Sequence, residues 1–230
     1  MLYEIFDHMH LCTDEAVREI LPLVSEQRRQ QALRYSHTFG RFCCLKSYLM
    51  LLELLSAVYP ELDTSKPEFG YTAQGKPFLL ARPDIHFSIS HTKNAILVAI
   101  SDAPIGVDIE AFRSPSAALI ARTMNATEQA AIATAAASAA TPSGQLEPPG
   151  TSGTREAHLE QPQASGTPEA LFSAIWTRKE AVLKLRGTGI EGDLKHVLSG
   201  SEAIITRIFP RKSYAFSIAQ QTISPFEILH

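Results

Sequence analysis

Three β-rich runs in the middle of the chain, with helical segments on both sides, constrain its fold more than any other feature. The runs cover residues 85–90, 95–101 and 105–110, and the polar turn at 91–94 predicts a hairpin between the first two. The other predicted elements are a strand at 2–11, a helix that starts at 13–15, helices at 25–34, 39–58, 116–124, 126–140 and 169–186, and strands at 202–209, 213–219 and 225–229. This repeated order predicts an α+β protein with two similar halves, residues 1–103 and 104–230.

The segment between residues 141 and 168 differs from the rest of the chain in composition. Its 28 residues include 5 Pro, 4 Gly and 7 Ser or Thr, and its only large apolar residues are Leu146 and Leu159. Such a segment buries too little apolar surface to offset the entropy of ordering it. We predict a flexible low-complexity insertion at about 134–168, without catalytic residues.

Composition and charge exclude several classes of protein. The 230 residues carry 21 Lys and Arg against 24 Asp and Glu, a formal charge of −3, which does not support a nucleic-acid binder. The longest strongly apolar stretch, 45–55, contains Lys46 and Glu53 and is too short to span a bilayer. No secretory signal is visible, and three cysteines do not form a disulfide framework or indicate a zinc site. We expect a cytoplasmic protein without a membrane or nucleic-acid partner.

Asp108 and Glu110 form the first pattern that could carry chemistry. They are two residues apart in a predicted strand, so both carboxylates project from the same face. Mg²⁺ prefers carboxylate oxygens and fills the rest of its shell with water and substrate phosphates. A metal site and a strand end with two exposed acids both fit this pattern.

The predicted helix at 169–186 carries a second pattern. Four apolar residues share one face by the helical period, namely Leu171, Ile175, Val182 and Leu185. Trp176, Glu180 and Lys184 fall on the other face, one turn apart. Glu180 could serve as a metal ligand or general base and Lys184 as a phosphate clamp or proton donor. A solvent-exposed Glu–Lys pair without a catalytic role is the competing interpretation.

Basic and hydroxyl side chains offer several candidate phosphate contacts. Ser90 and His91 lie at the end of a predicted strand, and Lys76 projects from a turn between Gly75 and Pro77. Two segments are locally positive: residues 21–50 contain Arg28, Arg29, Arg34, Arg41 and Lys46 against Glu26, and residues 176–190 contain Arg178, Lys179, Lys184 and Arg186 against Glu180. They could converge on one anionic ligand or form ordinary solvated helix faces. Together these residues indicate metal-plus-phosphate chemistry without a covalent protein nucleophile.

Four motifs in a fixed order resemble one known family. They are Gly75-Lys76-Pro77, Ser88-Ile89-Ser90-His91, Ile105-Gly106-Val107-Asp108-Ile109-Glu110 and Trp176-x-x-Lys179-Glu180-Ala181-x-x-Lys184. The series resembles the 4′-phosphopantetheinyl transferase superfamily, and the chain looks most similar to its single-chain, surfactin-synthetase-activating type outside residues 134–168. The resemblance implies two similar α+β halves that form a pseudo-dimer with the active site in the cleft between them. It also implies Mg²⁺-dependent transfer of the 4′-phosphopantetheine arm of coenzyme A to a carrier-protein serine, with release of 3′,5′-ADP.

The resemblance further implies a role for each matching residue. Asp108, Glu110 and Glu180 would bind Mg²⁺, with Mn²⁺ as the alternative ion. Asp108, Glu180 and Lys184 would be catalytic: Glu180 would take the serine proton and Lys184 would stabilise or protonate the departing phosphate. The residues that would bind coenzyme A are Lys76, Ser90, His91, Arg41, Arg28 or Arg29, Lys179 and Lys184. The family often has lysines where this chain has Gln27 and Gln30, which leaves the N-terminal phosphate contacts open.

The implied partners are acyl, peptidyl or aryl carrier protein domains of fatty acid, polyketide, nonribosomal peptide or lysine biosynthesis, with the enzyme itself a monomer. The sequence does not select among these carriers. A non-catalytic protein that binds coenzyme A or a carrier on the same fold is the alternative interpretation. An unrelated Mg²⁺-dependent phosphohydrolase is a further one.

Overall fold

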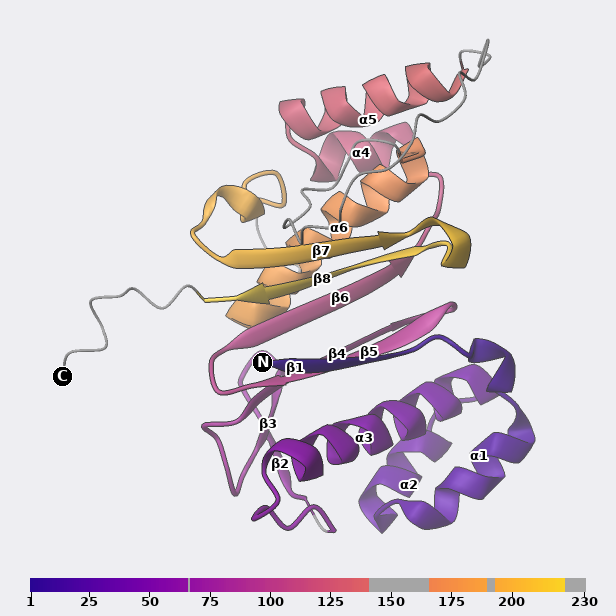
Figure 1. Ribbon diagram of the computed structural model, residues 1–230, viewed down its shortest axis with the longest axis vertical. Helices are drawn as coiled ribbons and strands as arrows, with labels where there is room; N and C mark the ends of the chain where they lie inside the picture. Colours follow the sequence, from indigo (N-terminus) through magenta and orange to yellow (C-terminus); the bar gives the residue numbers. More distant parts are fainter. Residues whose placement is uncertain (66, 141–165, 190–192, 222–230) are drawn as a thin grey trace, which may run out of the picture.

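The computed structural model describes residues 1–65, 67–140, 166–189 and 193–221. Its N-terminal half contains a three-stranded antiparallel sheet in the order β1 (Leu2–Phe6), β5 (Ala95–Ser101), β4 (His86–Thr92). Helix α3 (Thr38–Val58) covers the outer face of this sheet, and α1 (Asp14–Ile20) and α2 (Glu26–Leu33) pack against α3 (Figure 1). A two-stranded ribbon of β2 (Phe69–Tyr71) and β3 (Pro77–Leu79) lies beside it.

The C-terminal half contains a second three-stranded sheet. Its antiparallel sheet has the order β6 (Ile105–Ala111), β8 (Tyr214–Gln220), β7 (Ala203–Phe209). In both sheets the opening strand pairs with the second strand of a later hairpin, which becomes the central strand. Helix α6 (Pro168–Arg186) packs on β6 and β8, and α4 (Ala117–Thr123) and α5 (Ala126–Ala140) lie beyond it (Figure 1).

Period-two burial along β5 explains how the two sheets stack. Ile96, Val98 and Ile100 belong to the core beneath α3, whereas Ala95, Leu97 and Ala99 belong to a second core between the sheets. That second core also takes side chains from the C-terminal half, among them Val107 and Phe216. Because both faces are covered, every residue of β5 is buried. The continuous apolar run that predicted a strand is therefore the inner layer of the molecule.

A ladder of hydroxyl groups on β4 also joins the two halves. The backbone N–H groups of Val107, Ile109 and Ala111 on β6 donate to the side chains of Ser88, Ser90 and Thr92 at 3.0, 3.4 and 3.1 Å. β6 pairs with β8 on its other side, so these N–H groups would otherwise be unpaired at a buried sheet edge. The alternation Ser-x-Ser-x-Thr along β4 is thus matched to the repeat of the neighbouring strand.

Most predicted elements lie within a few residues of their expected positions, with several differences. The opening strand ends at Phe6, and a short 3₁₀ helix covers Met9–Leu11. β2 and β3 occupy a region where the sequence showed only turn signals. Residues 134–140 fall both in the predicted helix at 126–140 and at the predicted start of the insertion; they are helical and end α5, because an alanine-rich run favours helix. The remaining insertion up to 165 and the strand at 225–229 lie outside the described residues. No described helix is long and apolar enough to cross a membrane.

Candidate active site

A glycine on β6 sets the distance between that strand and α6. A Cβ atom on Gly106 would lie 2.1 Å from the carbonyl oxygen of Ala181 and 2.2 Å from the backbone nitrogen of Leu185. These are backbone atoms that cannot rotate away, so only glycine allows the helix to approach this closely. The contact brings the next residues on that face of β6, Asp108 and Glu110, beneath the turn of α6 that carries Glu180 and Lys184.

Asp108, Ser90 and Lys184 form a hydrogen-bonded triangle between the two halves. The ammonium of Lys184 donates to Asp108 Oδ1 at 2.7 Å and to Ser90 Oγ at 3.0 Å, and Ser90 Oγ donates to Asp108 Oδ1 at 2.8 Å. The Asp108 side chain is only 6% exposed, whereas that of Lys184 is 33% exposed. Lys184 therefore neutralises a buried carboxylate while part of its side chain stays accessible.

Two other carboxyl groups share this environment. Burial raises the pKa of Glu180, and the negative charge of Asp108 raises it further, against the opposing effect of Lys184. Burial and Asp108 likewise raise the pKa of Glu110, while Arg113 and a hydrogen bond from Trp176 lower it. The three acids thus repel one another electrostatically. The structure places Glu180 in this acidic cluster and pairs Lys184 with Asp108, which rules out the solvent-exposed Glu180–Lys184 pair.

Two carboxylate oxygens in the cluster are suited to bind a cation. Asp108 Oδ2 and Glu180 Oε1 are buried and have no hydrogen-bond partner. Buried carboxylate oxygens without partners are costly, and Mg²⁺ commonly takes one or two carboxylates together with water and phosphate oxygens. In the part of the chain that the structure describes, however, no three His, Cys, Asp or Glu side chains stand close enough to hold a metal ion. Asp108 and Glu180 fit Mg²⁺ as a pair, and the three-carboxylate site remains a prediction.

A cavity of about 370 Å³ opens beside this cluster. Residues 74–77 and 87–89 of the N-terminal half line one side of it. Glu180, Leu183, Lys184, Gly187 and Gly189 of the C-terminal half line the other. A volume of this size is typical of small-molecule sites. The cavity therefore presents a carboxylate and an ammonium to a space shared by both halves.

Lys76 and His91 lie near this space in different ways. The ammonium of Lys76 donates to the carbonyl oxygens of Ile105 and Leu185 at 3.2 and 3.1 Å, which ties the β2–β3 ribbon to the C-terminal half. Partial burial lowers the pKa of Lys76. The accessible ring of His91 contacts Phe39 edge-on, and desolvation by its surroundings, together with the charge of Lys184, lowers its pKa.

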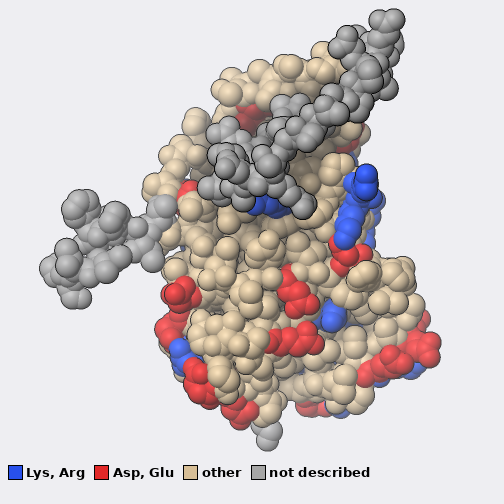
Figure 2. All heavy atoms as spheres, viewed as in Figure 1, with Lys and Arg blue, Asp and Glu red and all other residues tan. Residues whose placement is uncertain are grey.

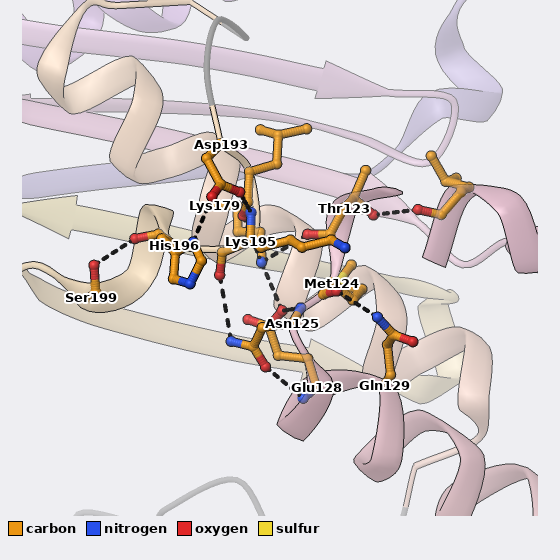
Figure 3. Close-up of polar contacts among 12 residues, drawn as sticks. Thr123, Met124, Asn125, Glu128, Gln129, Lys179, Asp193, Lys195, His196 and Ser199 are labelled. Atoms are coloured by element: carbon orange, nitrogen blue, oxygen red, sulfur yellow. Dashed lines mark hydrogen bonds and ion pairs between the residues drawn. The ribbon is translucent and has the colours of Figure 1, made fainter. Parts of the chain in front are cut away.

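Lys179 points away from the cavity. Its side chain is 1% exposed, and its ammonium forms an ion pair with Glu128 at 2.7 Å on the side of α6 that faces α4 and α5 (Figure 3). Successive helix residues point about 100° apart, so Lys179 and its neighbour Glu180 face different surroundings. The prediction that Lys179 binds coenzyme A does not fit this geometry, because a buried, paired ammonium cannot reach a ligand in the cavity.

The basic residues of α2 and α3 also lie apart from the cavity lining. Arg28 stacks over the ring of Tyr48 at 4.4 Å and lines a separate small pocket. Arg41 donates to the carbonyl oxygen of Tyr35 at 2.9 Å, and Arg29 pairs with Glu26. Lys184 of the second positive segment lines the cavity, whereas none of the basic residues of 21–50 does. Coenzyme A contacts by Arg28 and Arg41 stay predictions.

Four further residues shape the site, and each has a signal in the sequence. Gly106 stood between apolar residues of a predicted strand, where a glycine commonly marks close backbone approach. Ser88 and Thr92 alternate with Ser90 at the strand period. Lys179 lies four residues after Ile175 and three before Val182, on the predicted apolar face, which indicated a buried ammonium with partners.

Comparison with known proteins identifies the family. A sequence model of the 4′-phosphopantetheinyl transferase superfamily matches residues 104–221. A 4′-phosphopantetheinyl transferase of Bacillus subtilis is 29% identical over 127 residues, 55% of this chain and 56% of the relative. The 4′-phosphopantetheinyl transferase psf-1 of Bacillus pumilus is 26% identical over 174 residues, 76% of this chain and 62% of the relative. The chain thus spans between half and two thirds of the length of these relatives. It belongs to the 4′-phosphopantetheinyl transferase superfamily.

Proposed function

We propose that this chain transfers the 4′-phosphopantetheine arm of coenzyme A to a serine hydroxyl of a carrier protein and releases 3′,5′-ADP. The observation that carries the proposal is the cavity between the halves, which Glu180 and Lys184 line beside two unpaired buried carboxylate oxygens. Family membership supports the same reaction. In this view the two halves form a pseudo-dimer, and the shared cleft is the active site.

The residues suit a phosphoryl-type transfer. The serine oxygen forms a bond to the phosphorus that carries the pantetheine arm, and the bond from that phosphorus to the bridging pyrophosphate oxygen breaks. Glu180, whose pKa is raised by burial and by Asp108, accepts the proton of the serine hydroxyl. Lys184 lines the cavity and donates to the departing phosphate of 3′,5′-ADP. Asp108 and Ser90 hold the Lys184 ammonium in place for this step.

Asp108 and Glu180 would hold Mg²⁺, with Glu110 as the adjoining carboxylate. When bound, the ion supplies charge neutralisation of the coenzyme A pyrophosphate. Lys76 and His91 would contact the adenosine phosphate region. Ser90, predicted for the same region, donates its only O–H to Asp108 and accepts from Lys184 and the Ile109 N–H, so it would act there through Lys184. Two N–H bonds of the Lys76 ammonium go to backbone carbonyls, and a lysine has three, so one remains for a phosphate.

The partner is an acyl, peptidyl or aryl carrier protein, and the enzyme acts as a cytoplasmic monomer. We expect the carrier to be acidic and to approach a basic or apolar rim of the cleft. Figure 2 shows acidic side chains gathered over the N-terminal half on the face in view. These charges would repel an acidic partner, so we expect the carrier to avoid that part of the surface.

The test is a panel of apo-carrier proteins incubated with the protein, coenzyme A and Mg²⁺, followed by intact-mass spectrometry. We expect at least one carrier to gain the mass of one phosphopantetheine arm on its serine. Tight coenzyme A binding by calorimetry without a mass gain on any carrier would favour the non-catalytic alternative. Phosphate release from simple nucleotides would favour a phosphohydrolase.

Lys76 provides a second arm of the test. Lys76→Ala should mainly weaken coenzyme A binding and leave the rate at saturating coenzyme A less affected. Lys93→Ala is a matched control, since Lys93 is an exposed lysine of the β4–β5 turn that does not line the cavity. A loss of rate without a change in coenzyme A affinity would contradict the role of Lys76.

A further inference from the structure

The ammonium of Lys179 is fully used within the protein. It donates to the carbonyl oxygens of Thr123 and Leu194 at 2.9 and 2.8 Å and to Glu128 Oε2 at 2.7 Å (Figure 3). A lysine ammonium has three N–H bonds, so all of them have partners. No donor is left for a phosphate, even though Lys179 directly precedes Glu180 in the sequence.

The partners of Lys179 come from three separate parts of the C-terminal half. Thr123 ends α4, Glu128 lies in the first turn of α5, and Leu194 belongs to the segment that follows α6. Glu128 is itself held, because its Oε2 accepts from the backbone nitrogen of Asn125 at 2.8 Å and its own nitrogen donates to Asn125 Oδ1 at 2.9 Å. This reciprocal cap fixes the carboxylate before it meets the lysine.

This cluster lies on the side of α6 that faces away from the cavity. Gly187 and Gly189, directly after α6, line the cavity, and the chain is tied down again at Leu194 by Lys179. On the opposite side, the contact with Gly106 presses α6 against β6. The helix that carries Glu180 is therefore fixed by close packing in front and by a buried charge cluster behind.

We propose that Lys179 is a positioning residue: it anchors α4, α5 and the segment after α6 to the back of α6, and so places Glu180 and the cavity wall at Gly187 and Gly189. The proposal rests on the proposed transferase activity. Lys179 acts through these neighbours and does not touch coenzyme A. It is thereby distinct from Lys184, which faces the cavity on the same helix.

The test compares Lys179→Met with Glu128→Gln, measuring kcat with a carrier and the affinity for coenzyme A by calorimetry. Misplacement of catalytic groups by about 1 Å can cost about a hundredfold in rate. We expect Lys179→Met to lower kcat about tenfold or more and Glu128→Gln to lower it by a smaller factor, each with less than about a threefold change in coenzyme A affinity. The double variant should be no worse than Lys179→Met, because both changes break one cluster. Arg178→Met, at an exposed position of the same helix, is the matched control.

Hydrogen exchange provides a readout independent of activity. Backbone amides at 186–189 and 193–196 should exchange faster in both cluster variants than in the wild type or in Arg178→Met. If Lys179→Met does not fold, Glu128→Gln alone carries the rate and exchange tests. A tenfold or larger loss of coenzyme A affinity in Lys179→Met, with wild-type behaviour of Glu128→Gln, would overturn the proposal, as would unchanged rates and exchange in both. A wild-type protein that modifies no carrier would refute the proposed function, while the exchange result would still decide whether Lys179 fixes the cavity wall.

Discussion

The two sides of α6 differ in whether their buried charged groups have hydrogen-bond partners. Behind the helix, Lys179 and Glu128 are buried together, and every N–H of the ammonium has an acceptor. In front, Asp108 Oδ2 and Glu180 Oε1 are buried without a partner, and the pKa of Glu180 is raised by burial and by Asp108. A satisfied buried cluster serves the architecture, whereas unsatisfied oxygens beside a cavity are suited to a ligand. The motif residues Lys179 and Glu180 therefore have different duties although they are adjacent.

Of the changes considered, removal of the Asp108 carboxylate should reduce the rate of transfer most. Asp108→Ala takes away a proposed metal ligand and leaves the Lys184 ammonium without its carboxylate. Loss of one such electrostatic group commonly costs about a hundred- to a thousandfold in rate, and we expect transfer to fall by about a thousandfold. The measurement is the rate of carrier modification at saturating coenzyme A. Asp102→Ala, at an exposed acid, serves as the control, and a full rate in Asp108→Ala would contradict the site assignment.

The close contact between β6 and α6 at Gly106 can be changed without altering any polar side chain. Gly106→Ala places a Cβ atom within about 2 Å of two backbone atoms of α6. Such overpacking costs about 1–3 kcal/mol. We expect Gly106→Ala to lower the free energy of unfolding by about 3 kcal/mol and to slow transfer. Denaturant unfolding measures the first effect. Gly166→Ala, where the nearest atom is at 3.5 Å, should change little. Equal stability of the two variants would refute the close-approach argument.

Substitutions in the hydroxyl ladder of β4 test how much its hydrogen bonds to β6 stabilise the protein. Ser88→Ala removes the acceptor of the Val107 N–H at a buried position. An unsatisfied buried donor costs about 1–3 kcal/mol, so we expect unfolding at a correspondingly lower denaturant concentration. Ser56→Ala, in an exposed pair with Thr64, should be close to neutral. If Ser88→Ala were as stable as Ser56→Ala, β6 would not depend on β4 for its edge hydrogen bonds.

Two glutamates of α6 should respond to pH with opposite signs. The pKa of Glu180 is raised, so the folded state binds more protons than the unfolded state between the ordinary and the raised value, and stability falls as pH rises through that window. The pKa of Glu169 is lowered by hydrogen bonds with the backbone and Ser114, so its contribution is present above its ordinary value and is lost as pH falls. Near neutral pH we expect Glu180→Gln to raise Tm modestly while transfer is lost, and Glu169→Gln to lower Tm slightly. Melting curves from pH 4 to 8 would show this contrast, and shifts of the same sign would contradict it.

Sequence patterns predicted most of the scaffold because local signals and packing agree there. Leu45 and Leu55 of α3 and the apolar run of β5 are buried core positions, and Leu49 and Leu52 pack against this core. Thr13 and Ser25 cap helices α1 and α2. β2 and β3 were missed because three-residue strands show little alternation.

The site was harder to predict because it depends on which elements meet. The pairing of Lys184 with Asp108 joins residues 76 positions apart, and the buried position of Glu180 follows from packing of α6 between the sheet and α4 and α5. The coenzyme A contact predicted for Lys179 does not fit the structure, because its place in the motif does not determine which side of the helix it faces. Its partners Thr123, Glu128 and Leu194 come from distant parts of the sequence, and only the fold brings them together.

The central claim is that the front of α6 performs the transfer chemistry. Intact-mass spectrometry of a carrier panel, with wild-type protein and Asp108→Ala in parallel at saturating coenzyme A and Mg²⁺, tests it most directly. The account predicts that the wild-type protein adds one phosphopantetheine arm to a carrier serine and that Asp108→Ala does so about a thousandfold more slowly. No mass gain on any carrier with the wild-type protein, or equal rates for the two proteins, would contradict it.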